Sequence, residues 1–220
     1  MSVYQTIVRN TYWSALSTVG GLLMGLITNI VLARALGAPL LGRYNYWLWL
    51  IGLLALIASP GLPGAMTKFG AEYLGRDEKE TASAIFARLL RIELVLGALV
   101  GGTVLVYSLL VPASDTAALA LVAFSVLLVV VEVFFQAAAK GAQDFRVFSQ
   151  ASLIGGFLYG VAAIAIVSFG YGIYPLLIAY IGRRVLTILL IGWKLSSHYT
   201  LQGSPAPDVS DQERVNPVAK

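Results

Sequence analysis

Apolar residues fill this chain in long, continuous runs, and charged residues stand mainly at the ends of those runs. Between Arg9 and Arg34, and again between Arg43 and Lys68, 24 consecutive residues carry no charge. A helix of that length exceeds the roughly 30 Å hydrocarbon core of a bilayer. Because the runs are continuous and do not alternate with polar residues, they predict membrane-spanning helices rather than barrel strands.

The later gaps between charges extend this pattern to the end of the apolar region. The gap between Arg146 and Arg183 holds 36 residues, too many for one crossing, and the turn-like stretch Phe169–Pro175 divides it. The gaps predict six helices, near residues 13–35, 45–67, 86–111, 117–139, 147–169 and 174–195. The expected fold class is all-α, a polytopic membrane protein whose transmembrane unit covers residues 1–195. Residues 196–220 are polar and Pro-rich, which predicts a cytoplasmic linker or tail.

Composition narrows the function classes. The chain is 58% hydrophobic and only 12% charged, whereas a soluble domain has about 25% charged residues. It has no cysteine, and its one histidine, His198, lies in the polar tail, so we expect no thiolate or histidine centre, no metal, no cofactor and no enzyme activity. The net charge of +4 does not indicate nucleic-acid binding, because the basic residues flank apolar runs and imply contact with membrane lipids.

The basic residues also predict an orientation. Short loops on the cytoplasmic side of a membrane carry an excess of Lys and Arg. Two of the predicted loop arginines, Arg34 and Arg43, fall on one side of the membrane. Eleven basic residues fall on the other side: Arg9, Lys68, Arg76, Lys79, Arg88, Arg91, Lys140, Arg146, Lys194, Arg214 and Lys220. We therefore expect a multi-pass protein of the cytoplasmic membrane with both termini in the cytoplasm.

Charges inside the predicted spans are the most informative feature. Arg183 and Arg184 lie near the middle of the sixth predicted helix, and Glu132 lies inside the fourth. A charge at the bilayer centre costs at least about 2.5–3.5 kcal/mol, so each needs a partner or water. In one interpretation, at least one arginine lines a water-filled cavity and binds an anion. In the other, Glu132 pairs with one arginine and locks two helices, although a depth difference of roughly 10 Å argues against that pair.

One further acid, Glu93, stands beside Arg91 near the predicted cytoplasmic end of its helix. We expect its side chain to reach out to the interface between lipid and water.

The first predicted helix carries small and polar residues on an otherwise apolar run. Gly21 and Gly25 form a small-xxx-small pattern, which either lets two helices pack closely or reflects how common glycine is in membrane helices. Thr28 and Asn29 follow, and lipid offers them no hydrogen bonds. We expect both side chains to face other helices or a cavity.

The second predicted helix contains the stretch "SPGLPGAM", with Pro60, Gly61, Pro63 and Gly64. Two prolines and two glycines interrupt the hydrogen-bond ladder of a helix. We interpret the stretch as a break or hinge within a kinked helix, and the alternative is that the span simply ends at Ser59.

Several short motifs, in their order and spacing, resemble the N-terminal part of the polysaccharide-biosynthesis flippases. These are Wzx-type members of the multidrug/oligosaccharidyl-lipid/polysaccharide exporter superfamily, and the resemblance covers residues 1 to about 195. Its motifs are an Ala-Arg-x-Leu-Gly then Gly-x-Tyr junction, a Gly-Leu-Pro break, and a Gly-x-x-Asp/Arg-Phe stretch. Here they fall on Ala33, Arg34, Leu36, Gly37, Gly42, Tyr44, Gly61, Leu62, Pro63, Gly141, Asp144 and Phe145.

The resemblance implies a transporter that moves a lipid-diphosphate-linked oligosaccharide across the cytoplasmic membrane for polysaccharide biosynthesis. Its anionic diphosphate would give cationic groups a role, with Arg34 at the mouth of a cavity and Arg183 or Arg184 deeper. The family has two six-helix lobes, so this chain corresponds to one lobe, and the second would come from a longer chain or another copy. An ion-coupled multidrug exporter of the same superfamily and a truncated, non-transporting membrane scaffold are the alternatives.

Overall fold

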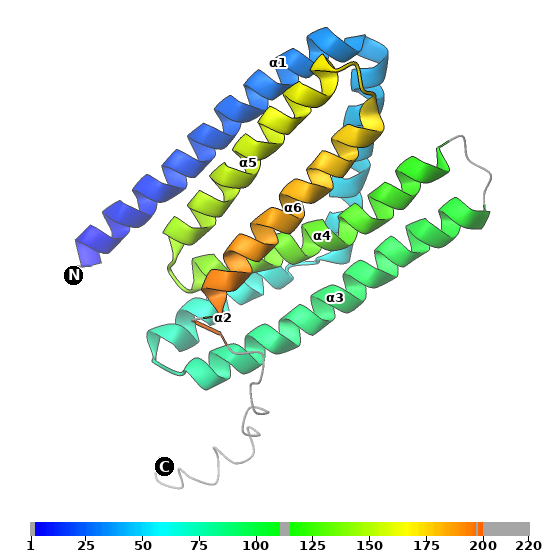
Figure 1. The fold of residues 1–220 in the computed structure, drawn as a ribbon. Helices are drawn as coiled ribbons and strands as arrows, with labels where there is room; N and C mark the ends of the chain where they lie inside the picture. Colours follow the sequence, from blue (N-terminus) through cyan, green and yellow to red (C-terminus); the bar gives the residue numbers. More distant parts are fainter. Residues whose placement is uncertain (1–2, 111–114, 197, 200–220) are drawn as a thin grey trace, which may run out of the picture.

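The computed structural model describes residues 3–110, 115–196 and 198–199, and the regular structure within them is helical throughout (Figure 1). This agrees with the all-α fold class that the apolar runs predict. The helices are α1 (Val3–Ala58), α2 (Leu62–Gly75), α3 (Lys79–Leu110), α4 (Thr116–Gly141), α5 (Phe145–Ser168) and α6 (Ile173–Leu195).

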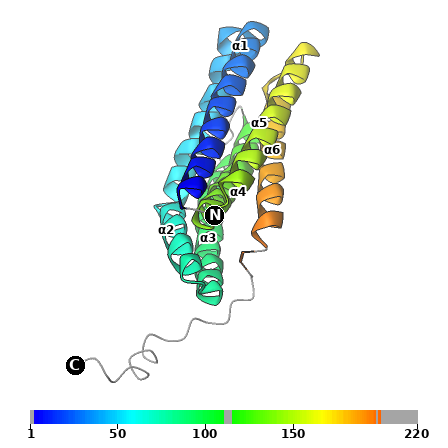
Figure 2. The same ribbon diagram turned by 90° about the vertical axis from the view of Figure 1, so that its left-hand side faces the viewer.

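Helix α1 folds back on itself at Gly37. The backbone of Gly37 has φ 69° and ψ 171°, a combination that is essentially restricted to glycine. Pro39 follows, and its missing N–H is tolerated because the helix restarts there. The two arms, residues 3–36 and 38–58, diverge from this bend in Figure 1, where the first runs alongside α5 and the second descends behind α6. In Figure 2 the first arm lies in front of the second. The first two predicted helices are therefore the arms of α1, joined by a sharp bend instead of a loop.

A second interruption separates α1 from α2. Helix α1 ends at Ala58 and α2 begins at Leu62, with Gly61 between them in the left-handed conformation at φ 79°. The sequence predicted a break within a kinked helix over 45–67, and the structure places the interruption at residues 59–61, after which a separate helix continues to Gly75. Pro63 and Gly64 lie in the first turn of α2 and not in the break itself.

Five helices, α1, α3, α4, α5 and α6, are long and apolar enough to cross a membrane. The bend in α1 supplies a sixth arm. Helix α4 is the most buried of the five and packs against every other helix. Helix α3 begins at Lys79 rather than near residue 86, because the charged link that precedes its apolar run is itself helical. The side chain of Asp144 caps α5 by accepting a hydrogen bond from the Val147 backbone N–H at 3.2 Å.

Two groups of buried side chains hold the bundle together. One joins both arms of α1 to α4, α5 and α6, and the other joins α2, α3, α4, α5 and α6. Tyr199 belongs to the second group: its ring stacks on Phe86 at 4.9 Å and its hydroxyl donates to the Ala138 carbonyl at 3.3 Å. The predicted tail thus begins with a residue that packs on the bundle, and residues 197 and 200–220 lie outside the described part.

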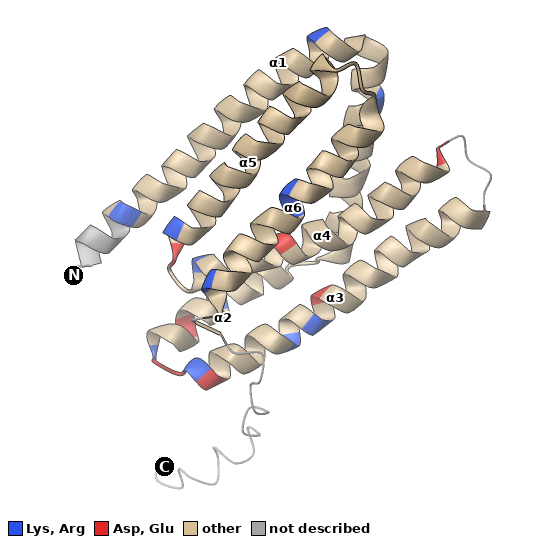
Figure 3. Cartoon of the chain, viewed as in Figure 1, with Lys and Arg blue, Asp and Glu red and all other residues tan. Residues whose placement is uncertain are grey.

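Charged residues gather toward the end of the bundle that holds α2, and the helices are otherwise mostly uncharged (Figure 3). This distribution follows from the sequence, in which charges stand at the ends of apolar runs. A few charges nevertheless lie within the helices, and their surroundings define the candidate site.

Candidate functional site

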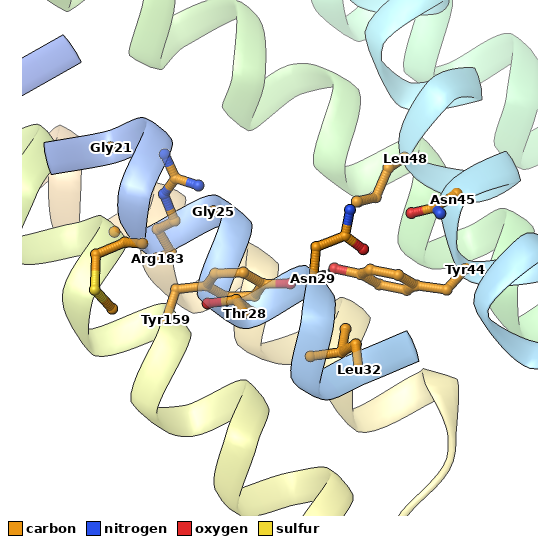
Figure 4. A pocket seen from close by; sticks show the side chains of 12 residues that line it. Gly21, Gly25, Thr28, Asn29, Leu32, Tyr44, Asn45, Leu48, Tyr159 and Arg183 are labelled. Carbon is orange, nitrogen blue, oxygen red and sulfur yellow. Dashed lines mark hydrogen bonds between the residues drawn. The ribbon is translucent and has the colours of Figure 1, made fainter. Parts of the chain in front are cut away.

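A polar pocket lies between the two arms of α1, α5 and α6 (Figure 4). Its volume is about 220 Å³. The lining combines small, hydroxyl, amide and cationic side chains: Gly21, Met24, Gly25, Thr28, Asn29, Leu32, Tyr44, Asn45, Leu48, Gly156, Tyr159 and Arg183. Such a concentration of polar groups is unusual in an apolar bundle and marks the candidate ligand site.

The first arm of α1 forms one wall of this pocket. Thr28 and Asn29 line it, which confirms that these polar residues face helices or a cavity. Gly21 and Gly25 line it too, and a Cβ atom at either would have no neighbour within 4 Å. Interpreting this pair as a close-packing motif is therefore wrong. Close packing occurs at Gly160 of α5, where a Cβ would lie 2.9 Å from the Thr28 hydroxyl.

Two tyrosines close the base of the pocket. The hydroxyls of Tyr44, on the second arm of α1, and Tyr159, on α5, are hydrogen-bonded to each other. Figure 4 shows the two rings pointing toward one another from opposite walls. The Tyr159 ring also meets the edge of Tyr180, with centroids 6.3 Å apart. Sequence reasoning placed Tyr44 in a junction motif but did not identify it, or Tyr159, as a site residue.

Arg183 reaches the pocket from α6. Helices α5 and α6 approach closely at Gly155, where a Cβ would lie 2.6 Å from the Thr187 hydroxyl and 3.5 Å from Cγ of Arg183. The guanidinium carbon lies 5.9 Å from the centre of the Tyr159 ring. Its Nε is buried without a hydrogen-bond partner, and Arg183 forms no ion pair within the described residues. This cation therefore faces the pocket without a counter-charge.

Arg184 has a different environment although it is the next residue. It donates to the Glu132 carboxylate of α4 at 2.5 Å and to the Tyr180 hydroxyl at 2.5 Å. Gln136 donates to the other Glu132 oxygen at 2.9 Å. The structure thus favours the helix-locking interpretation for Arg184 and Glu132. The depth argument against their pairing is wrong, because α4 and α6 cross at an angle (Figure 1) and a long arginine side chain spans the remainder.

The two arginines of the α1 junction also differ. Arg34 is exposed on the first arm and does not line the pocket. Arg43, which sequence reasoning did not select, donates through Nε to Asp115 at 3.0 Å, and the Tyr174 hydroxyl donates to the same carboxylate at 3.0 Å. The Arg43 guanidinium holds the pKa of the Asp115 carboxyl below its usual value. This cluster ties α1 to the first residues of α4 and α6.

Glu93 is buried, so the expectation that it reaches the interface is wrong. Its side chain has 0% of its surface exposed and accepts a hydrogen bond from the Ser59 hydroxyl at 2.7 Å. Arg91, two residues earlier, is exposed and follows the expected pattern. At about 100° per residue, positions two apart point to nearly opposite faces of a helix, and the linear sequence alone did not reveal which face points inward.

The acidic side chains lie in separate environments. Glu132 pairs with Arg184, Glu93 bonds to Ser59, and Asp115 bonds to Arg43 and Tyr174. Within the part of the chain that the structure describes, no three acidic or histidine side chains gather into a group that would hold a metal ion.

Comparison with known proteins places this arrangement in a family. A family model described as "Polysaccharide biosynthesis protein" matches residues 7–214 of the 220. The chain belongs to this polysaccharide biosynthesis protein family. Membership confirms the resemblance found in the sequence motifs, and together with the apolar helices it makes the chain a multi-pass membrane protein.

Solved structures of transporters share the fold of this family member. One is an outward-facing multidrug resistance transporter of the MATE family in the MOP superfamily, with 21% identity and a TM-score of 0.72. Another is a MOP superfamily transporter from Pyrococcus furiosus, described as having a binding pocket of reverse polarity, with the same identity and TM-score. A third, a MATE protein in a bent conformation, has 19% identity and a TM-score of 0.72.

The extent of these matches is uneven. Each covers 96% of this chain but only 50% of the solved transporter, so the chain spans about half the length of these structures. This agrees with one lobe of a two-lobe transporter. No curated protein matches the sequence.

Proposed function

We propose that this chain is one lobe of a transporter that moves a lipid-diphosphate-linked oligosaccharide across the cytoplasmic membrane. The observation that carries the proposal is the Arg183 guanidinium, which faces a polar pocket inside an apolar bundle and has no counter-charge among the described residues. A cation in that position costs free energy unless water or an anion accompanies it. An anionic ligand is therefore the natural occupant of the pocket.

A diphosphate matches the groups that line this pocket. Arginine presents several N–H donors in a planar fork that fits phosphate oxygens in a bidentate manner. The amides of Asn29 and Asn45 supply further donors around the pocket, and the Tyr44–Tyr159 pair adds the hydroxyl proton that its mutual hydrogen bond does not use. We propose that Arg183 binds the diphosphate and that Arg184 positions α6 through its ion pair with Glu132. Arg34, exposed near the bend, remains proposed as a contact at the mouth.

The size of the pocket explains why a second lobe is needed. Pockets for drug-sized ligands usually measure about 300–1,000 Å³, and this one measures about 220 Å³. It accommodates the diphosphate but leaves no wall around an oligosaccharide. We propose that a second six-helix lobe, from a longer chain or another copy, closes the site, and that the break at Pro60 and Gly61 serves as a hinge.

The charge of the pocket disfavours the multidrug alternative for cationic drugs. Arg183 repels a cationic drug and attracts an anion. Among the described residues, no carboxylate lines this pocket to reverse that preference. The excess of basic residues at the α2 end supports the proposal that both termini lie in the cytoplasm.

Binding measurements with the full chain in nanodiscs test this function. We expect Arg183→Gln to weaken binding of a polyprenyl diphosphate about tenfold or more, because it removes a charge-assisted hydrogen bond. Arg183→Lys keeps the positive charge but lacks the planar fork of donors. Its affinity for the diphosphate should lie between those of the parent and Arg183→Gln. Arg91→Gln, which changes an exposed arginine, serves as the matched control.

The ligand series separates the alternatives. A polyprenyl alcohol should not compete, because it lacks the diphosphate. Equal binding of the diphosphate by the parent chain and Arg183→Gln would overturn the assignment. A parent chain that binds a lipophilic cation and no diphosphate would support a multidrug exporter, and one that binds neither would support a scaffold.

A further inference from the structure

Glu93 lies in a closed environment directly beside the break between α1 and α2. Its side chain is fully buried in the middle of α3. One carboxyl oxygen accepts a hydrogen bond from Ser59, the first residue after α1 ends, and the other oxygen is buried without a partner. The break itself is held by a left-handed Gly61, whose N–H donates to the Ser59 carbonyl at 2.9 Å.

Within the described residues, no cation forms a salt bridge with this carboxyl. The charged groups on the helices that pack against α3 are engaged elsewhere: Arg43 of α1 with Asp115, Lys68 over Phe69, Arg76 with Glu72, Glu132 with Arg184, and Lys140 over Phe148. On α3 itself, Arg88 and Arg91 are exposed. Within the described residues, Ser59 is the one side chain that hydrogen-bonds to Glu93. An isolated carboxylate is unfavourable in such a place, whereas the neutral acid buries no charge. The surroundings therefore suit the protonated form.

We propose that Glu93 is a proton-binding site that controls the break at residues 59–61. With the proton bound, neutral Glu93 accepts the Ser59 hydrogen bond and keeps the second arm of α1 against α3. When the proton leaves the carboxyl oxygen for water, the resulting charge requires hydration. The Ser59 contact then opens, and the arm is free to move relative to α2.

This movement would reach the ligand pocket. Tyr44 and Asn45 lie on the same arm of α1 that ends at Ala58, one residue before Ser59. A helix transmits a rigid displacement along its length, so a change at the break moves the wall opposite Arg183. This link to transport rests on the proposed function, whereas proton binding at Glu93 does not.

The absence of cysteine makes the test direct, because one introduced thiol is the sole thiol in the chain. Ala58→Cys places it at the last residue of α1, beside the break, where the side chain is buried in this structure. Gly75→Cys, at an exposed position without neighbours at the end of α2, is the reference site. The ratio of the two alkylation rates in the full chain removes the intrinsic effect of pH on thiols and reports the opening of the break.

We expect this ratio to rise severalfold as the pH is raised and Glu93 loses its proton. Glu93→Gln, which keeps the acceptor for Ser59 but cannot ionise, should hold the ratio low at every pH. Glu93→Asp should restore a pH-dependent rise at a shifted midpoint. Glu80→Gln, at an exposed acid of the same helix, should behave like the parent.

An unchanged rise in Glu93→Gln would overturn the proposal. If Glu93→Gln does not fold, an identical midpoint in Glu93→Asp and the parent would overturn it as well. The outcome is separate from that of the proposed function, because alkylation needs no ligand. A chain that binds no polyprenyl diphosphate but still shows the Glu93-dependent rise would retain the proton site and lose the substrate assignment.

Discussion

At the scale of single residues, the two adjacent arginines of α6 have separate tasks. Arg183 faces the pocket, and Arg184 pairs with Glu132. The sequence indicated that the two side chains diverge by about 100° and that both a cavity and an ion pair were plausible. It did not show which arginine takes which task, because that depends on the rotation of α6 against α5. The close approach at Gly155 fixes this rotation, and it is visible only in three dimensions.

The ion pair between Glu132 and Arg184 gives a prediction about stability. The Glu132 side chain has 1% of its surface exposed and that of Arg184 has 16%. Removing one member leaves the other charge buried alone, so Glu132→Gln should lower the free energy of unfolding by about 3–5 kcal/mol. The double variant Glu132→Gln/Arg184→Gln should recover much of this loss, because no isolated charge remains.

Thermal melts in detergent of the parent, both single variants and the double variant complete the cycle. Since Arg183 is unchanged, the folded double variant should still bind polyprenyl diphosphate. If the stability loss of the double variant equalled the sum of the losses of the two single variants, a direct pair would be contradicted. Loss of diphosphate binding in a folded double variant would show that Arg184 contacts the ligand.

At the scale of helices, the gaps between charges located α4, α5 and α6 to within two residues at each end. The rule works there because charges mark the membrane boundary on both sides of a span. It was less accurate around α1, α2 and α3, where polar helix continues beyond the apolar run. A charge count also cannot distinguish a loop from a sharp bend, so the fold-back at Gly37 required knowledge of one backbone angle.

That bend yields a prediction with a matched control in the same junction. Gly37→Ala should lower the free energy of unfolding by about 1–3 kcal/mol, because a Cβ is strained at φ 69°. Gly42→Ala lies five residues later, where the backbone is helical and a Cβ has no neighbour within 4 Å. It should be neutral or slightly stabilising. Melting temperatures of the two variants decide the matter, and an equal effect of both would show that the bend does not depend on glycine.

At the scale of the whole molecule, the chain spans about half the length of the solved transporters that share its fold. The sequence predicted a single six-helix lobe from its six apolar segments together with the family resemblance. The shape of the pocket was not predictable, since its lining comes from helices that are distant in sequence. Thr28 of α1 and Tyr159 of α5 meet there only after the chain has folded.

The second lobe itself is open to test by crosslinking. Asn45 is exposed at the pocket, and Leu99 is exposed on α3, away from it. In the cysteine-free background, Asn45→Cys should crosslink to another copy of the chain through a short reagent that is thiol-reactive at both ends. Leu99→Cys should crosslink far less, because its surroundings would be lipid. The product with Asn45→Cys should have twice the mass of the chain, and polyprenyl diphosphate should change its yield by occupying the space between the lobes. Equal crosslinking yields at both positions, unchanged by the diphosphate, would mean that no second copy faces the pocket. The second wall of the site would then have to come from a different polypeptide or from a longer form of the same one.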